Sequence, residues 1–141
     1  MATTRRATTD WAGSLLEGSG RVTLQSSGLG TFDVNWPARA EEPNGTTSPE
    51  ELVAAAHSSC YSMAFSNALA KAGTPPEKLA VTAAVTFQPG EGITGVHLTV
   101  VGTVPGADEA DFLRMAEEAK LGCPVSKALT GTTITLEASL A

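Results

Sequence analysis

The chain has 141 residues, of which 42% are hydrophobic and 17% charged, and its formal net charge is −6. This length suits one domain with a hydrophobic core. The negative charge makes nucleic acids and anionic membrane surfaces poor partners. Two cysteines are too few for a disulfide scaffold. The first residues carry two arginines with no apolar run behind them, so we expect a cytoplasmic protein without a signal peptide or transmembrane segment.

The N-terminal part of the sequence predicts three strands. We expect them over residues 8–17, 21–26 and 31–36, separated by glycine-containing turns. In the third strand Phe32, Val34 and Trp36 alternate with polar residues, which indicates a half-buried strand. Three strands in succession favour an antiparallel meander. Residues 37–47, which include Arg39, follow as a polar loop.

The stretch from Ser48 to Gly73 predicts one long helix with Cys60 at its centre. Ser48 is a favourable N-cap, and Glu51 three residues later completes a capping box. Gly73 suits the C-terminal end of the helix. Because the stretch is small and apolar on most sides, we expect this helix to be buried all round, in the centre of the core.

The C-terminal half predicts two more strands, a helix and a last strand. Residues 79–87 and 93–104 are rich in strand-forming residues and flank a hairpin turn at 88–92. Residues 108–121 predict an amphipathic helix, and residues 123–129 a short helical turn that begins at Pro124. The strand at 132–140 completes a βββ-α-ββ-α-β order. Strands that come in runs predict the α+β class with mainly antiparallel sheets, here in a single domain over residues 1–141.

The two thiols offer the clearest chemistry in the sequence. Cys60 lies in the middle of the long helix, and Cys123 lies at the N-cap of the short one, where the helix dipole lowers a thiol pKa. A thiol in an apolar helix needs a cation to stabilise its thiolate. A guanidinium could do so and could orient a peroxide oxygen, provided that a carboxylate held it in place. Arg39 and Glu50 are the candidates nearest to the helix.

Helix geometry restricts how these residues can meet. Glu50 and Cys60 are ten positions apart in one helix, which corresponds to roughly 15 Å along its axis. Glu50 therefore cannot reach the Cys60 of its own chain. If the two share a site, they come from two chains whose long helices cross near Ala55, and this mechanism requires a homodimer.

Two motifs resemble a known family. The segment from Gly45 to Leu52 (GTTSPEEL), followed by AAHSSC up to Cys60, is similar to the signature of the OsmC/Ohr peroxidases, the osmotically induced and organic hydroperoxide resistance proteins. GCPVS around Cys123 resembles their second cysteine motif. The likeness covers nearly the whole chain, and the WPAR segment that contains Arg39 is similar to the OsmC branch.

The resemblance implies a function and a role for each candidate residue. It implies an intertwined homodimer with two active sites at the interface, which reduces organic hydroperoxides, and hydrogen peroxide less well. Cys60 would attack the peroxide, and Cys123 would resolve the sulfenic acid as an intrachain disulfide. Arg39 would support the thiolate and Glu50 would anchor Arg39. The resemblance implies no bound cofactor or metal, and an external dithiol as the reductant.

Other interpretations remain open from the sequence. Cys60 could be a small core residue, and the same fold could bind an apolar molecule or act as a redox-sensing regulator without catalysis. Arg21 could replace Arg39, since the Ohr branch takes its arginine from an earlier loop. His57 lies one turn before Cys60, and a hydrogen-bonded core histidine is favoured over a Cys–His relay. A zinc site from His57, Cys60, His97 and Cys123 lacks the usual tight ligand spacing.

Overall fold

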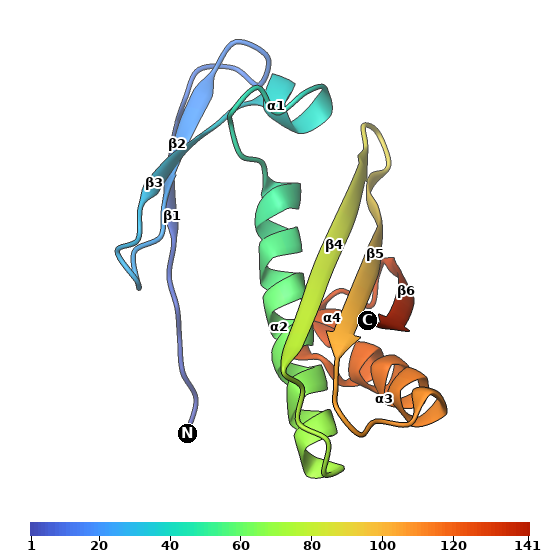
Figure 1. Cartoon of the computed structure of the whole chain (residues 1–141). Coiled ribbons are helices and arrows are strands. Elements are labelled where there is room, and N and C mark those ends of the chain that lie inside the picture. Colours follow the sequence, from blue (N-terminus) through green and yellow to red (C-terminus); the bar gives the residue numbers. More distant parts are fainter. The chain divides into compact units, whose positions relative to one another are not determined.

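The computed structural model describes residues 1–141. It has the α+β architecture that the sequence predicts, with two three-stranded sheets and four helices (Figure 1). The chain divides into two compact units, Met1–Leu52 and Val53–Ala141, which are described in turn. The expectation of a single domain stays a prediction.

The first unit contains the predicted antiparallel meander. Strands β1 (Thr8–Ala12), β2 (Ser19–Thr23) and β3 (Thr31–Val34) lie in that order in one sheet. The strand predicted over residues 8–17 is too long, because β1 ends at Ala12, just before Gly13, whose φ of 93° belongs to the left-handed region. Residues beyond Gly13 form the turn into β2, where the amide of Gly18 donates to the carbonyl of Ser14.

Helix α1 (Trp36–Ala40) corrects the sequence prediction of a strand to residue 36 and a loop from 37. Asn35 caps this helix, since its Oδ1 accepts a hydrogen bond from the amide of Ala38 at 2.8 Å. Pro37 is preorganised for the first turn. The consequence for function is that Arg39 lies in the last turn of a helix, which fixes the direction of its side chain better than a loop would.

Helix α2 (Pro49–Lys71) has the ends that the sequence predicts. The Oγ of Ser48 accepts a hydrogen bond from the amide of Glu51 at 3.1 Å, which is one half of the predicted capping box. The carboxylate of Glu51 accepts its hydrogen bond from the hydroxyl of Thr47 rather than completing the box. At the other end Gly73 has a φ of 89°, and the amide of Thr74 donates to the carbonyl of Leu69. The helix stays regular between these caps, so the rows of side chains along it are well defined.

The burial of α2 differs from the prediction that it is buried all round. Within the second unit His57, Tyr61, Phe65 and Leu69, spaced four residues apart, are fully buried, whereas 72% of Met63 is exposed. One row of large side chains suffices to bury the helix on one face. Most other residues of this helix are alanine and serine, whose small side chains expose little apolar surface when they are not buried.

The second sheet has the order β4-β5-β6, from strands Lys78–Gln88, Gly92–Thr103 and Thr133–Leu140. Strands β4 and β5 form the predicted antiparallel hairpin, and β6 runs parallel to β5. A parallel pair needs a crossover, which helices α3 (Glu109–Gly122) and α4 (Pro124–Ala128) provide. The sheet backs the core, and residues of α3 and α4 pack into this core.

The core of this unit lies between α2, the sheet and α3. The predicted apolar face of α3 is confirmed, because Phe112, Met115, Ala116 and Ala119 are its buried residues. The rings of Phe65 and Phe112 pack with their centroids 5.1 Å apart. The hydroxyl of Tyr61 donates to the carbonyl of Ala116 at 3.0 Å. This packing ties the central turns of α2 to α3, next to both cysteines.

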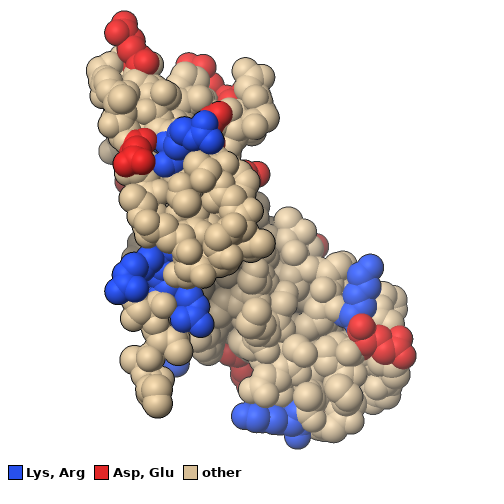
Figure 2. Space-filling view, turned by 90° about the vertical axis from the view of Figure 1, so that its left-hand side faces the viewer, with Lys and Arg blue, Asp and Glu red and all other residues tan.

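The surface agrees with the mixed charge of the sequence. On the face shown in Figure 2, basic and acidic side chains occur in small groups separated by uncharged surface. This face carries no continuous basic surface of the kind that follows a nucleic-acid backbone. None of the helices combines the length and the apolar character that crossing a bilayer requires.

Candidate active site

The two cysteines come from different elements of the second unit. Cys60 lies on α2 and is partly exposed, whereas Cys123 is fully buried at the junction of α3 and α4. The Cys123 amide donates to the carbonyl of Ala119 at 2.9 Å, and its own carbonyl accepts from the amide of Lys127 at 3.0 Å. Cys123 therefore ends one helix and begins the next, which fixes its backbone on both sides.

The structure brings the two thiols together. The side chains of Cys60 and Cys123 are within hydrogen-bond distance, and the backbone N–H of Val125 donates to the sulfur of Cys60. Burial raises the pKa of the Cys60 thiol, the amide of Val125 lowers it, and the neighbouring Cys123 raises it. Both cysteines are free thiols. Two neighbouring thiols can form a disulfide on oxidation, but an added positive charge is needed to favour the Cys60 thiolate.

The different exposure of the two sulfurs distinguishes their possible roles. Cys60 can be reached by a small molecule from outside, whereas Cys123 has no exposed surface. An oxidant therefore meets Cys60 first. Cys123 lies behind it, beside the Cys60 thiol.

Arg39 and Glu50 form a second pair, in the first unit. The Nε of Arg39 donates to the Oε1 of Glu50 at 2.8 Å. Glu50 is buried, and its second oxygen, Oε2, has no hydrogen-bond partner in the chain. The carboxylate thus holds the guanidinium by one edge from the last turn of α1 and the first turn of α2. Arg21, the alternative, pairs with Asp33 at 3.8 Å on the exposed sheet.

A mainly apolar cavity of about 340 Å³ lies beside Arg39 in the first unit. Strands β1 to β3, α1 and the start of α2 contribute to its wall, which includes Trp11, Val22, Trp36 and Leu52. Apolar walls with a single guanidinium suit a ligand that has an apolar body and one polar end.

His57 has a hydrogen-bond partner beside the thiols that the sequence analysis did not name. The Nε2 of His57 on α2 and the Oγ of Ser126 on α4 are 2.7 Å apart, and both residues are buried. This confirms His57 as a hydrogen-bonded core histidine, and burial lowers its pKa. One signal for the pair is visible in the sequence, since His57 precedes Cys60 by three residues and Ser126 follows Cys123 by three.

The zinc alternative has no matching geometry in the structure. The structure contains no group of three or more His, Cys, Asp and Glu residues that could hold a metal ion, so the four residues of the zinc hypothesis do not form such a group.

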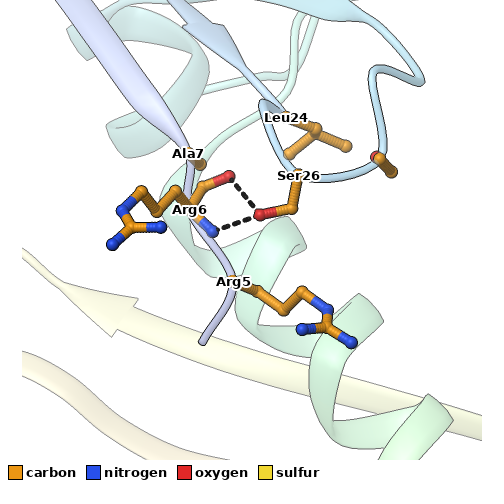
Figure 3. A pocket seen from close by; sticks show the side chains of 6 residues that line it. Arg5, Arg6, Ala7, Leu24 and Ser26 are labelled. Carbon is orange, nitrogen blue, oxygen red and sulfur yellow. Dashed lines mark hydrogen bonds between the residues drawn. The ribbon is translucent and has the colours of Figure 1, made fainter. Parts of the chain in front are cut away.

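A cavity of about 420 Å³ near the N-terminus is lined by Arg5 and Arg6 (Figure 3). The backbone of Arg6 is bonded to Ser26, and the two guanidinium groups point to opposite sides of the segment.

Comparisons with known proteins agree on one family. The family model described as OsmC-like protein matches residues 42–137. The chain is 36% identical to peroxiredoxin OsmC of Escherichia coli strain K12 over 143 aligned positions, which cover 99% of each chain. An organic hydroperoxide resistance protein from Elizabethkingia anophelis is 24% identical, with a TM-score of 0.70 and coverage of 100% and 99%. Another, from Bacillus subtilis, is 22% identical, with a TM-score of 0.67 and coverage of 96% and 98%. The two solved structures establish the fold.

Proposed function

Because this chain belongs to the OsmC family, we propose that it is a thiol-dependent peroxidase that reduces organic hydroperoxides, and hydrogen peroxide less well. The observation that carries this proposal is the contact between a partly exposed Cys60 and a buried Cys123. Two inert core cysteines would gain nothing from this arrangement, whereas a two-step thiol reaction requires it.

The reaction balances with one dithiol per peroxide. The thiolate of Cys60 attacks the terminal oxygen of ROOH, the O–O bond breaks, and the alkoxide takes up a proton and leaves as the alcohol. Cys60 is now a sulfenic acid. Cys123 attacks its sulfur as a thiolate, an S–S bond forms, and the displaced hydroxide takes up a proton to become water. An external dithiol then reduces the disulfide by exchange and is itself oxidised.

Arg39 and Glu50 complete this proposal as the groups that act on the thiolate and the peroxide. The guanidinium of Arg39 would favour the charged form of Cys60 and hold the peroxide oxygens, and Glu50 would fix its direction. Burial raises the pKa of Cys60 in the single chain, and a nearby cation would lower it again. The apolar cavity beside Arg39 supports an organic rather than an inorganic peroxide.

We further propose that the active enzyme is a homodimer in which the partner subunit's Arg39 and Glu50 serve Cys60. Ten residues of one helix separate Glu50 from Cys60, which is roughly 15 Å. The exposed side of α2 is consistent with a second chain packing against it, because the exposed Met63 lies there among small residues. A helix surface of small residues permits the close approach that a two-fold contact needs.

The proposal also states where the enzyme works and what it needs. We place it in the cytoplasm, where free thiols are maintained and a dithiol reductant such as a lipoyl group is at hand. It needs no bound cofactor or metal, because the sulfur atoms of the chain and of the reductant carry both electrons.

The test is peroxide consumption by the purified protein with a dithiol present. We expect cumene hydroperoxide to be consumed faster than hydrogen peroxide. Cys60→Ser should abolish turnover. Cys123→Ser should still accept one equivalent of peroxide, but without a disulfide. A loss of the mass of two hydrogen atoms from one chain would identify the intrachain bond. Full activity in Cys60→Ser would refute the proposal, and unchanged thiols would leave the apolar cavity as a non-catalytic binding site on the same fold.

A further inference from the structure

Helix α4 contains five residues, Pro124–Ala128. A helix this short does not persist by its own hydrogen bonds, so its position depends on contacts with the rest of the chain. Its N-cap, Cys123, makes no side-chain capping hydrogen bond. Val125 and Leu129 pack against the core, but apolar contacts of this kind allow sliding. The backbone N–H of Val125 donates to the Cys60 sulfur, and a second directional contact between α4 and α2 would restrain Cys123 further.

The His57–Ser126 hydrogen bond has the required position. It joins α2 to α4 over 2.7 Å, and each partner lies about one helical turn from one of the cysteines. No part of His57 and only 4% of Ser126 is exposed, so water does not compete for this bond. A directional bond between the same two helices that carry the thiols restrains how those thiols can move apart.

We propose that the buried His57–Ser126 hydrogen bond is a positioning contact that keeps Cys123 against Cys60 and thereby sets the rate of disulfide formation. This inference rests on the proposed peroxidase function, and it concerns the second chemical step. Neither residue touches the peroxide. Cys123 must attack the sulfenic sulfur in line with the S–O bond that breaks. A thiol that is already held in this position loses less conformational entropy in the attack than a freely moving one.

The contact also has a protective consequence. A sulfenic acid that waits for its partner can react with a second peroxide and become a sulfinic acid, which this enzyme cannot reduce. Fast resolution by Cys123 therefore determines how much peroxide the protein survives. The His57–Ser126 bond would raise that limit without changing the first step.

The test separates the two steps in single-turnover experiments. Ser126→Ala should form the sulfenic acid at the wild-type rate, measured by trapping with a 1,3-dicarbonyl reagent. Its disulfide should form about fivefold to tenfold more slowly, which corresponds to the loss of one buried hydrogen bond. More sulfinic acid should accumulate at high peroxide. Ser62→Ala is the matched control, because its hydroxyl donates to the carbonyl of Ser58 within α2, at 2.7 Å, and joins no other element.

Two substitutions of the histidine keep the test decisive if Ser126→Ala folds poorly. Gln places an amide where Nε2 lies and should retain most of the resolution rate. Asn is too short to reach Ser126 and should lose it. A purely structural role would predict equal resolution rates in all folded variants, so equal rates in Ser126→Ala, His57→Asn and the wild type would overturn the positioning role.

A second measurement is independent of peroxide. In glutathione redox buffers, the effective concentration of the Cys60–Cys123 pair should fall about fivefold to tenfold in Ser126→Ala, because only the reduced protein is loosened. An unchanged value would again refute the inference. If Ser126→Ala shows this fall but the wild-type protein consumes no peroxide, the proposed function is contradicted and the positioning contact stands.

Discussion

The Arg39–Glu50 pair should contribute measurably to stability. We consider Arg39→Gln, Glu50→Gln and the double variant. Hydrogen bonds to charged groups contribute about 1.5–3 kcal/mol when shielded from water. Here 9% of the Glu50 side chain but 32% of the Arg39 side chain is exposed, so solvent weakens the interaction. We therefore expect a coupling free energy of about 1–2 kcal/mol, with Glu50→Gln alone costing a similar amount.

The assay is urea unfolding at one fixed protein concentration. Arg114 and Glu118 give a matched control, because they also pair at 3.0 Å but with 58% and 62% of their side chains exposed. Their double-mutant cycle should give a clearly smaller coupling, because solvent screens an exposed ion pair. If the coupling between Arg39 and Glu50 is no larger than that of the exposed pair, burial does not strengthen the ion pair and the reasoning is wrong.

The same variants test which arginine serves the thiolate. Arg39→Gln should lower kcat/KM by about tenfold or more, since a displaced positioning group has a large effect on rate. The pH at which activity reaches half its maximum should rise, because a thiolate without its cation forms at higher pH. Arg21→Gln should leave both values unchanged. The reverse result would assign the role to Arg21.

Two further changes test the structure around the thiols. Burial lowers the pKa of His57, so the unfolded chain takes up a proton below about pH 6.5 that the folded chain takes up only at lower pH. The free energy of unfolding should therefore fall as the pH drops below 6.5, by up to about 1.4 kcal/mol per pH unit more steeply than in His57→Gln; equal slopes by urea unfolding would contradict this. Gly102→Ala should destabilise by about 1–3 kcal/mol, since its Cβ would lie 2.8 Å from the buried ring of Phe112. Phe112→Leu in the same chain should relieve part of that loss, and additive effects would argue against the clash.

Local signals predicted the long helix well. Ser48 and Gly73 act on residues close to them in the chain, so their effect is visible in the sequence, and the structure uses both as predicted. Glu51 differs, because its carboxylate accepts a hydrogen bond from Thr47 instead of completing the capping box. The amphipathic face of α3 was predictable for the same reason. Helix α1 was missed because the alternation of Phe32, Val34 and Trp36 continues past the end of β3. The signal for the end of the strand was Asn35, a favourable N-cap residue two positions before Pro37.

Contacts between distant segments were harder to predict. The approach of Cys123 to Cys60 depends on how α4 packs on α2, which no local pattern encodes, and it was expected only through the family resemblance. The burial of α2 was overestimated because composition does not tell which face meets the sheet. The link between His57 and Ser126 could have been inferred from their equal spacing from the two cysteines, once these were taken to be in contact.

The parallel pairing of β6 with β5 has a consequence for how the protein matures. Cys123, the proposed resolving cysteine, lies in the crossover between these strands, and β6 follows it in the sequence and completes the sheet. The hairpin of β4 and β5 can form from neighbouring residues, whereas the parallel strand must close a long loop and therefore forms more slowly. A chain still emerging from the ribosome would thus present Cys60 before Cys123 is in place. In the proposed peroxidase, newly made molecules would be the ones most easily lost to irreversible oxidation, and the copies that finished folding earlier would carry the activity under peroxide.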